Sequence, residues 1–305
     1  MAATRSFWPQ ALHTRDASRR PIAAVRLALT AYLADPSHWA STGARSVVEA
    51  ALEWQQGPRL QSLWTSGAPR WVQTDAHDIE RFLHELQSMH GPRHNLDVRL
   101  YDQPGIAMAG VRYREVRVNA ASTGLLEWTF PAAMPADEIW RQVCWLADTH
   151  PLWSATVGYV VAFEPEFEVT AFNYGYTLSR RFLGIDLQHP ERFARRAREG
   201  LPSVNWITVF GGPLWQLLQP RTSSEPPAGV TSHASARAGM AWRAGPRPQL
   251  GDCNLMDYPE QLAALTHHLD GCIHPEPPLY PGLFEQEPDD DLTRRWQRRL
   301  LDGGW

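Results

Sequence analysis

The densest group of side chains able to bind a metal lies near the end of the chain. His267, His268, Cys272 and His274 fall within eight residues, at the end of an expected helix. Imidazole and thiolate are ligands that zinc prefers, so this cluster would suit a metal-dependent hydrolase. The sequence offers no second cluster with paired ligand spacing, and the helix dipole alone favours histidines at a helix C-terminus. We therefore predict no metal, no catalytic residue and no cofactor.

A second unusual pattern is a run of alternating acidic residues. Glu164, Glu166 and Glu168 alternate with Pro165, Phe167 and Val169, and residues 164–172 are expected to be extended. In a strand, the three carboxylates would share one face. The pattern fits an exposed edge strand protected from aggregation by charge and proline, and it fits equally an acidic stripe that contacts a basic partner.

The tail contains a second acidic run, which includes Asp289, Asp290 and Asp291. Runs of like charge are usually solvated, but this one is also a candidate for partner binding. Together with Glu164, Glu166 and Glu168, these residues are the predicted contact positions. The net charge of −4 lies entirely in residues 161–305, the half that contains both acidic runs.

Composition excludes several classes of function. All 29 basic residues are arginine, so Schiff-base and lysine–phosphate chemistry are unavailable. The sequence lacks a G-x-S-x-G elbow, a P-loop and a dinucleotide-binding fingerprint. An isoelectric point near 6.3 argues against a nucleic-acid binder. Three cysteines without C-x-x-C spacing, and an N-terminus without an apolar run, predict a reduced, cytoplasmic protein that does not contact membranes.

The elements that must position these residues follow from periodicity and turn residues. Runs of strands separated by amphipathic helices predict an α+β fold with a mainly antiparallel, mixed sheet and helices packed on one face, in two similar strand–helix halves or as one unit. Residues 219–238 are expected to be a loop. The expected strands are 25–33, 96–101, 111–116, 125–130, 156–163, 164–172, 204–210 and 240–244, and the expected helices are 47–52, 79–86, 135–150, 190–198, 214–218 and 259–269.

Two segments of the second half resemble a known protein family. Residues 200–211 fit the pattern G-x-x-x-V-N-W-x-T-x-x-G, and residues 245–254 fit G-x-x-P-x-x-G-D-x-N. Both resemble segments of the type VI secretion immunity protein family (TsiV-like), and the resemblance extends over about residues 22–271. The motif positions are expected to be structural, because a buried Trp and a turn Gly-Asp specify a fold. These positions are Asn205, Trp206, Gly211, Gly245, Pro248, Gly251, Asp252 and Asn254.

The resemblance implies a binding protein rather than an enzyme. Members of the family protect a bacterium by sequestering a toxic effector that its own or sister cells deliver. A cytoplasmic immunity protein implies a cytoplasmic target, so the expected partner is a type VI effector toxin with a nuclease domain, contacted without direct binding of nucleic acid.

Alternative functions and domain boundaries remain open at this stage. A metal-dependent hydrolase that uses the histidine cluster and an adaptor or chaperone for an effector are the two alternatives. We expect a flexible arm at 1–20, a single immunity-type domain at 21–272 with a subdivision near 170 as an option, and a Pro-rich acidic and arginine-bearing tail at 273–305.

Overall fold

The computed structural model describes residues 12–35, 38–53, 59–66, 68–88, 96–118, 121–187, 189–219, 225–275 and 295–304. The strands are β1 (His13–Arg15), β2 (Pro21–Leu33), β3 (Ser62–Thr65), β4 (Val72–Gln73), β5 (Asp97–Tyr101), β6 (Gly110–Val118), β7 (Ala121–Thr129), β8 (Leu152–Phe163), β9 (Ile185–Asp186), β10 (Ile207–Phe210), β11 (Val230–Ala234) and β12 (Met240–Ala244). The α-helices are α2 (Ala44–Glu53), α3 (Ala76–Ser88), α4 (Ala136–Thr149), α5 (Glu168–Ser179), α6 (Pro190–Phe193), α7 (Gly212–Leu218) and α8 (Glu260–Leu269).

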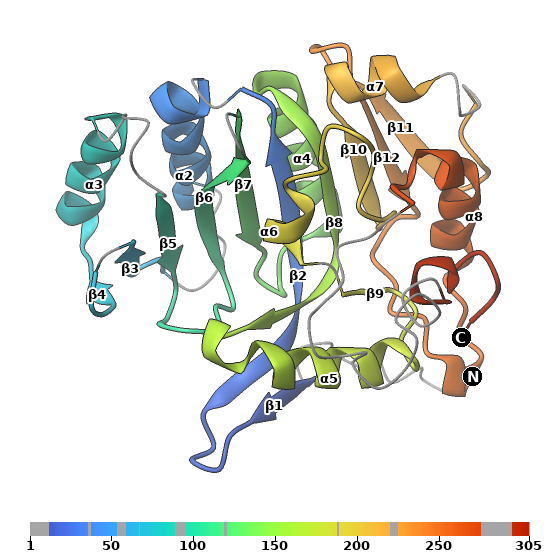
Figure 1. The fold of residues 1–305 in the computed structure, drawn as a ribbon, viewed down its shortest axis with the longest axis horizontal. Helices are drawn as coiled ribbons and strands as arrows, with labels where there is room; N and C mark the ends of the chain where they lie inside the picture. Colours follow the sequence, from blue (N-terminus) through green and yellow to red (C-terminus); the bar gives the residue numbers. More distant parts are fainter. Residues whose placement is uncertain are drawn as a thin grey trace.

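One sheet runs through the whole molecule (Figure 1). Twelve strands of the described residues belong to it, in the order β11-β12-β10-β8-β2-β7-β6-β5-β3-β4, with β1 beside β2 and β9 beside β8. Among the described strands, only the β8–β9 pairing is parallel. The predicted α+β class and mainly antiparallel sheet are therefore confirmed, and both halves of the sequence contribute to the same sheet.

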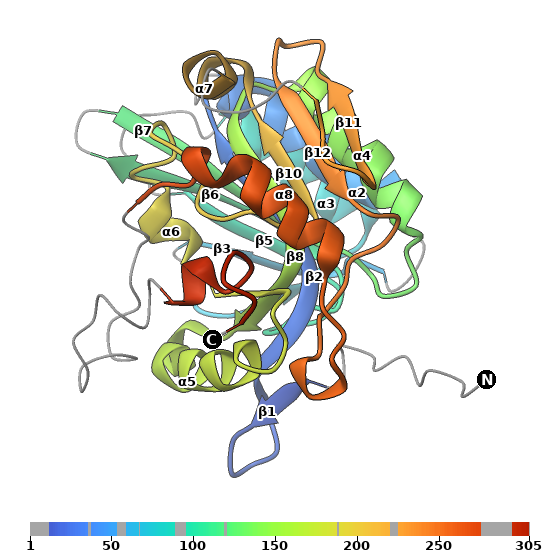
Figure 2. The ribbon, with the colours of Figure 1, turned by 90° about the vertical axis from the view of Figure 1, so that its right-hand side faces the viewer.

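The helices cover both faces of this sheet, although we expected them on one. Arg243 of β12 contacts Asp137 of α4, whereas the adjacent Trp242 packs against His268 of α8. Successive strand residues point to opposite faces, so α4 and α8 lie on opposite sides of β12. Figures 1 and 2 show α2 and α3 on the side of α4, and α5 and α6 on the other.

The physical reason for two covered faces lies in the central strands. In β2, Leu29 and Tyr32 point to opposite faces and both are buried. Leu29 belongs to the large core with α2 and α4, whereas Tyr32 packs against Phe193 of α6 with ring centroids 5.2 Å apart. A strand that is apolar on both faces needs a covering layer on each.

Two expectations about extended and loop segments are wrong. The predicted strand at 164–172 is helical, because β8 ends at Phe163 and is followed by a 3₁₀ turn (Pro165–Phe167) and then α5. Pro165 cannot donate to a strand ladder, but its fixed φ suits the first position of a helix. The predicted loop at 219–238 contains β11, which pairs with β12; its residues 220–224 lie outside the described chain.

Parts of the expected arm and tail pack on this fold. Strand β1 pairs with β2, and the last described segment, 295–304, buries Trp296 and Arg299. The Arg299 guanidinium donates to the carbonyls of Leu183, at 2.8 Å, and Ile185, at 3.1 Å. Residues 1–11 and 276–294 lie outside the described chain.

A pair of histidines lies where the turn after β2 meets the start of β8. His38 Nε2 lies 3.0 Å from His150 Nδ1, and the ring of Trp39 packs on His150 with centroids 4.9 Å apart. Burial, together with the nearby charges of His38 and Arg237, lowers the pKa of His150 to about 4.

This pair makes stability depend on pH in a defined direction. Protonation of His150 favours the unfolded chain, where its pKa is about 6.5. The free energy of unfolding should therefore fall as the pH decreases from about 6.5 to 4, by at most roughly 3 kcal/mol. Urea unfolding at pH 7.5 and pH 4.5 measures this change. The variant His150→Gln should reduce the pH dependence of the free energy of unfolding. The control variant His267→Gln, at an exposed position on α8, should leave this dependence unchanged. If His150→Gln has the same pH dependence as the wild type, His150 is not the group responsible.

Candidate functional site

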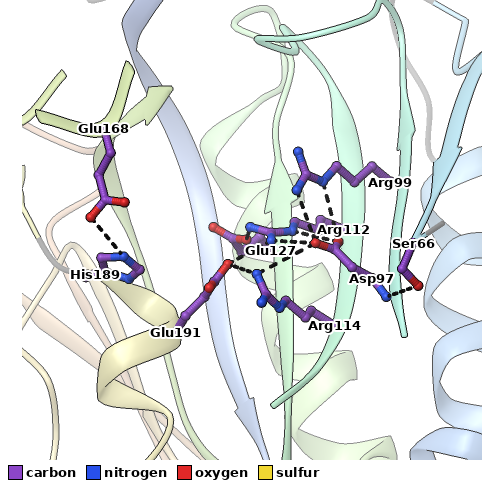
Figure 3. A network of polar contacts seen from close by, with 9 residues as sticks. All are labelled: Ser66, Asp97, Arg99, Arg112, Arg114, Glu127, Glu168, His189 and Glu191. Atoms are coloured by element: carbon purple, nitrogen blue, oxygen red, sulfur yellow. Dashed lines mark hydrogen bonds and ion pairs between the residues drawn. The ribbon is translucent and has the colours of Figure 1, made fainter. Parts of the chain in front are cut away.

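Three adjacent strands carry a network of arginines and carboxylates on one face (Figure 3). Strand register determines this grouping: Arg99 of β5 lies opposite Arg112 of β6, and Arg112 lies opposite Glu127 of β7. Asp97 lies opposite Arg114 in the same way. The intervening residues point to the other face and enter the core, so the alternation of each strand separates the charged face from the apolar one.

Arg112 is the centre of the network. Its Nε and Nη2 donate to the two oxygens of Asp97 at 3.0 and 2.8 Å, and its Nη1 donates to Glu127 at 2.8 Å. The side chains of Arg112 and Asp97 are only 13% and 10% exposed. Burial alone would raise the pKa of Asp97, but the hydrogen bonds and charges of Arg112 and Arg99 outweigh it and hold the pKa at about 2.

Helix α6 contributes Glu191 to this network from a distant part of the sequence. Glu191 accepts a hydrogen bond from Arg112 Nη2 at 2.8 Å and also pairs with Arg114. His189 lies two residues before Glu191. Its Nε2 is 3.4 Å from Oε1 of Glu168 at the start of α5. The network therefore joins β5, β6 and β7 to α6, while the His189–Glu168 contact joins α6 to α5 (Figure 3).

A cavity of about 290 Å³ borders the network. Its lining includes three arginines and four carboxylates. The carboxylates of Asp97, Glu127 and Glu191 pair with these arginines, so the network mainly positions its own members. Because carboxylates outnumber arginines, the lining favours a cationic group over an anionic one. Among the described residues, no group of three or more His, Cys, Asp or Glu is arranged to hold a metal ion.

The predicted acidic stripe does not exist as a stripe. Glu164 and Glu166 both pair with Arg20 of the β1–β2 turn, at 2.8 and 3.3 Å, and Glu168 turns away toward His189 and the cavity. Helical geometry after Phe163 separates the three carboxylates that an extended chain would have aligned. Asp289, Asp290 and Asp291 lie outside the described residues.

The first sequence motif builds the junction between β10 and its neighbours. Buried Asn205 donates from Nδ2 to Ser203 at 2.9 Å and to the carboxylate of Asp186 at 2.5 Å. Trp206 donates from Nε1 to the carbonyl of Gly245 at 3.2 Å. Gly211 packs directly against the backbone at the start of β8.

The second motif builds the turn after β12. Gly245 and Gly251 adopt φ values of +78° and +68°, a region that favours glycine. Asp252 accepts two hydrogen bonds from Arg181, at 2.9 and 2.7 Å, and caps the backbone N–H of Asn254 at 3.1 Å. Pro248 lies half-buried between the two glycines. Because Trp206 binds Gly245, the two motifs meet in space.

Comparison with known proteins assigns the chain to a family. Residues 45–300 match the profile of TsiV, described as type VI immunity for VRR-NUC. The chain belongs to the TsiV family. The resemblance expected from the two motifs is thereby confirmed, and with it the assignment to type VI immunity proteins, which act in competition between bacteria.

The fold of this TsiV chain is also similar to a solved structure. It matches the Pseudomonas aeruginosa T6SS protein PA0821 with a TM-score of 0.76, at 16% sequence identity, over 96% of this chain and 88% of that one. At this identity the likeness concerns the fold alone. No curated protein gives a match.

The alternative metal site is not assembled in this TsiV fold. His274 pairs with Glu199 at 3.0 Å, Cys272 Sγ lies 3.9 Å from the carbonyl of Leu218, and His268 packs on Trp242. These three side chains of the predicted cluster therefore have different neighbours, and the fourth, His267, is exposed. In the described part of the chain, no helix is long and apolar enough to cross a membrane.

Sequence reasoning missed the network of the TsiV chain. A usable signal was present, because Asp97, Arg99, Arg112 and Arg114 occupy the polar positions of two predicted strands. Opposite charges on the same face of neighbouring strands predict ion pairs. No local signal identifies Glu191, which joins the network only through the position of α6.

Proposed function

We propose that this protein is an immunity protein that binds a type VI VRR-NUC toxin directly and blocks its nuclease activity. The match of residues 45–300 to the TsiV family is the observation that carries this proposal. An inhibitor that protects by binding needs a rigid surface complementary to the toxin and does not need catalytic groups. A single sheet with buried ion pairs provides a rigid fold that can carry such a surface.

The location follows from the toxin class. A nuclease acts on nucleic acid inside the cell, and an inhibitor protects only where it meets its target, so we place the protein in the cytoplasm. A nuclease also carries a basic surface for phosphates. The net charge of −4 favours binding of this protein to such a basic surface and disfavours its binding to nucleic acid.

Co-expression tests the proposal. Cells that produce the VRR-NUC domain encoded nearest to this chain should lose viability and degrade their DNA, and co-expression of the chain should restore growth. The two purified proteins should form a complex, and the chain should inhibit plasmid cleavage at a molar ratio near that of the complex. An effector adaptor would bind the toxin without rescuing the cells. Absence of both complex and rescue contradicts the proposal.

A further inference from the structure

An exposed apolar tip stands out on the molecular surface. Residues 253–257, here called the 253–257 loop, are all exposed and follow the buried Asp252. Leu255 and Met256 at its centre are 69% and 92% exposed. Figure 1 shows this loop, in orange, at the lower right of the molecule. Two adjacent large apolar residues therefore project into solvent.

The backbone at this tip is also unfavourable. Met256 has φ of +54° and ψ of +30°, the left-handed region that residues other than glycine, asparagine and aspartate rarely adopt. The conformation costs roughly 1–2 kcal/mol, in addition to leaving the side chain in water. Such a strained and exposed position is a reason to look for a function.

The surrounding structure holds the 253–257 loop rigidly. Its N–H groups bond back to the loop base, from Leu255 to the carbonyl of Asp252 at 2.9 Å and from Met256 to that of Cys253 at 3.2 Å. Arg181 fixes Asp252 from the adjacent segment and its own carbonyl accepts from Cys253 N–H at 2.9 Å. The family-motif residues thus build the support of the tip, and the tip is preorganised.

We propose that Leu255 and Met256 enter an apolar pocket, rimmed by basic groups, on the VRR-NUC domain of the toxin. This inference rests on the proposed function. A loop whose backbone is already held in place binds without the entropic cost of ordering that backbone, and clustered apolar anchors typically supply most of the binding energy. The acidic side chains of Asp257 and Glu260 beside the tip are exposed, and they complement a nuclease with a basic surface.

The same charges argue against a second copy of this chain as the occupant. A symmetric dimer through the tip would place the same patch of both copies together. Asp257 and Glu260 would then face their own counterparts, and like charges across an interface are repulsive.

The variant Met256→Asn separates binding from folding. Asparagine tolerates the left-handed conformation well, so the variant should unfold at the same urea concentration as the wild type or higher. Its affinity for the purified VRR-NUC domain, measured by calorimetry, should fall at least tenfold, and rescue of toxin-producing cells should weaken. Leu217→Gln removes a 56% exposed apolar residue on α7 and serves as the matched control with unchanged affinity.

Cys253 provides an independent measurement without any substitution. Cys253 is exposed in the 253–257 loop, whereas Cys144 is half-buried and Cys272 is buried. The rate of Cys253 alkylation by a maleimide should fall at least tenfold in the complex with the toxin domain.

The outcomes distinguish this inference from the function on which it rests. If the wild-type chain does not bind the toxin, both fail. If it binds, but Met256→Asn binds equally well and Cys253 stays reactive in the complex, the tip is not the contact and the proposed function stands. If Met256→Asn instead changes the mass of the chain in light scattering with toxin affinity unchanged, the tip mediates self-association and the inference is overturned.

Discussion

Replacing Arg112 with methionine should destabilise the protein by about 3–5 kcal/mol, because removal of the central cation leaves three carboxylates of a buried network with too little positive charge. Asp97, Glu127 and Glu191 all bond to this guanidinium, and the Asp97 side chain is only 10% exposed. Methionine retains most of the volume, so the loss reports the charge rather than a cavity. Urea unfolding at pH 7, followed by circular dichroism, measures it.

The pH dependence of this loss identifies its cause. In the wild type, the lowered pKa of Asp97 contributes stability above about pH 4 that is lost as the pH falls toward 2. Without Arg112, only Arg99 and Arg114 remain to offset burial, so the pKa of Asp97 should rise from its wild-type value and protonation should reduce the cost of the buried charge as the pH falls. The difference between wild type and Arg112→Met should therefore be smaller at pH 4.5 than at pH 7. An equal difference at both values contradicts the charge explanation.

A matched control uses an exposed arginine. Arg141 of α4 is 72% exposed and pairs with Glu138 one turn away. Exposed pairs contribute about 0–1 kcal/mol, so Arg141→Met should have little effect on the free energy of unfolding. A loss as large as that of Arg112→Met would show that any arginine removal destabilises the chain.

Periodicity predicted the elements around this network well. The alternation at 25–33 predicts most of strand β2, and the apolar spacing at 135–150 predicts helix α4. The short pattern at Glu164–Glu168 was misread, because three alternating residues fit the first turn of a helix as well as a strand. Pro165 at the start and acidic residues in the first turn favour the helix. Helix-start residues therefore decide the structure of this segment over its short alternation.

The candidate sites depend on contacts that a single sequence does not contain. Arg112 and Glu191 are 79 residues apart, and only the packing of α6 on the sheet brings them together. The exposed tip is a similar case. The local sequence does not show that Leu255 and Met256 are exposed, because large apolar residues are usually buried in the core. The base of their loop is held by the contact of Asp252 with Arg181, 71 residues earlier, which the local sequence does not show.

The first family motif ends at a glycine whose role is spatial. Gly211 has φ of −70° and ψ of +159°, which any residue can adopt. A Cβ atom there would lie 1.7 Å from the carbonyl oxygen of Leu152 and 2.4 Å from its carbon. The Gly211 N–H also donates to the carbonyl of Trp153 at 2.9 Å. The end of β10 is therefore held against the start of β8 at a distance that leaves no room for a side chain.

Gly211→Ala should consequently destabilise the protein by roughly 3 kcal/mol or more, since backbone on both sides must separate and a flexible side chain cannot move aside. Soluble yield and urea unfolding of the purified variant measure the effect. Ala238→Gly is the control in the adjoining β11–β12 turn: Ala238 has φ of +59°, so glycine there should leave stability unchanged or increase it. If Gly211→Ala unfolds at the wild-type urea concentration, the close approach of β10 and β8 does not constrain this position, and the motif glycine needs another explanation.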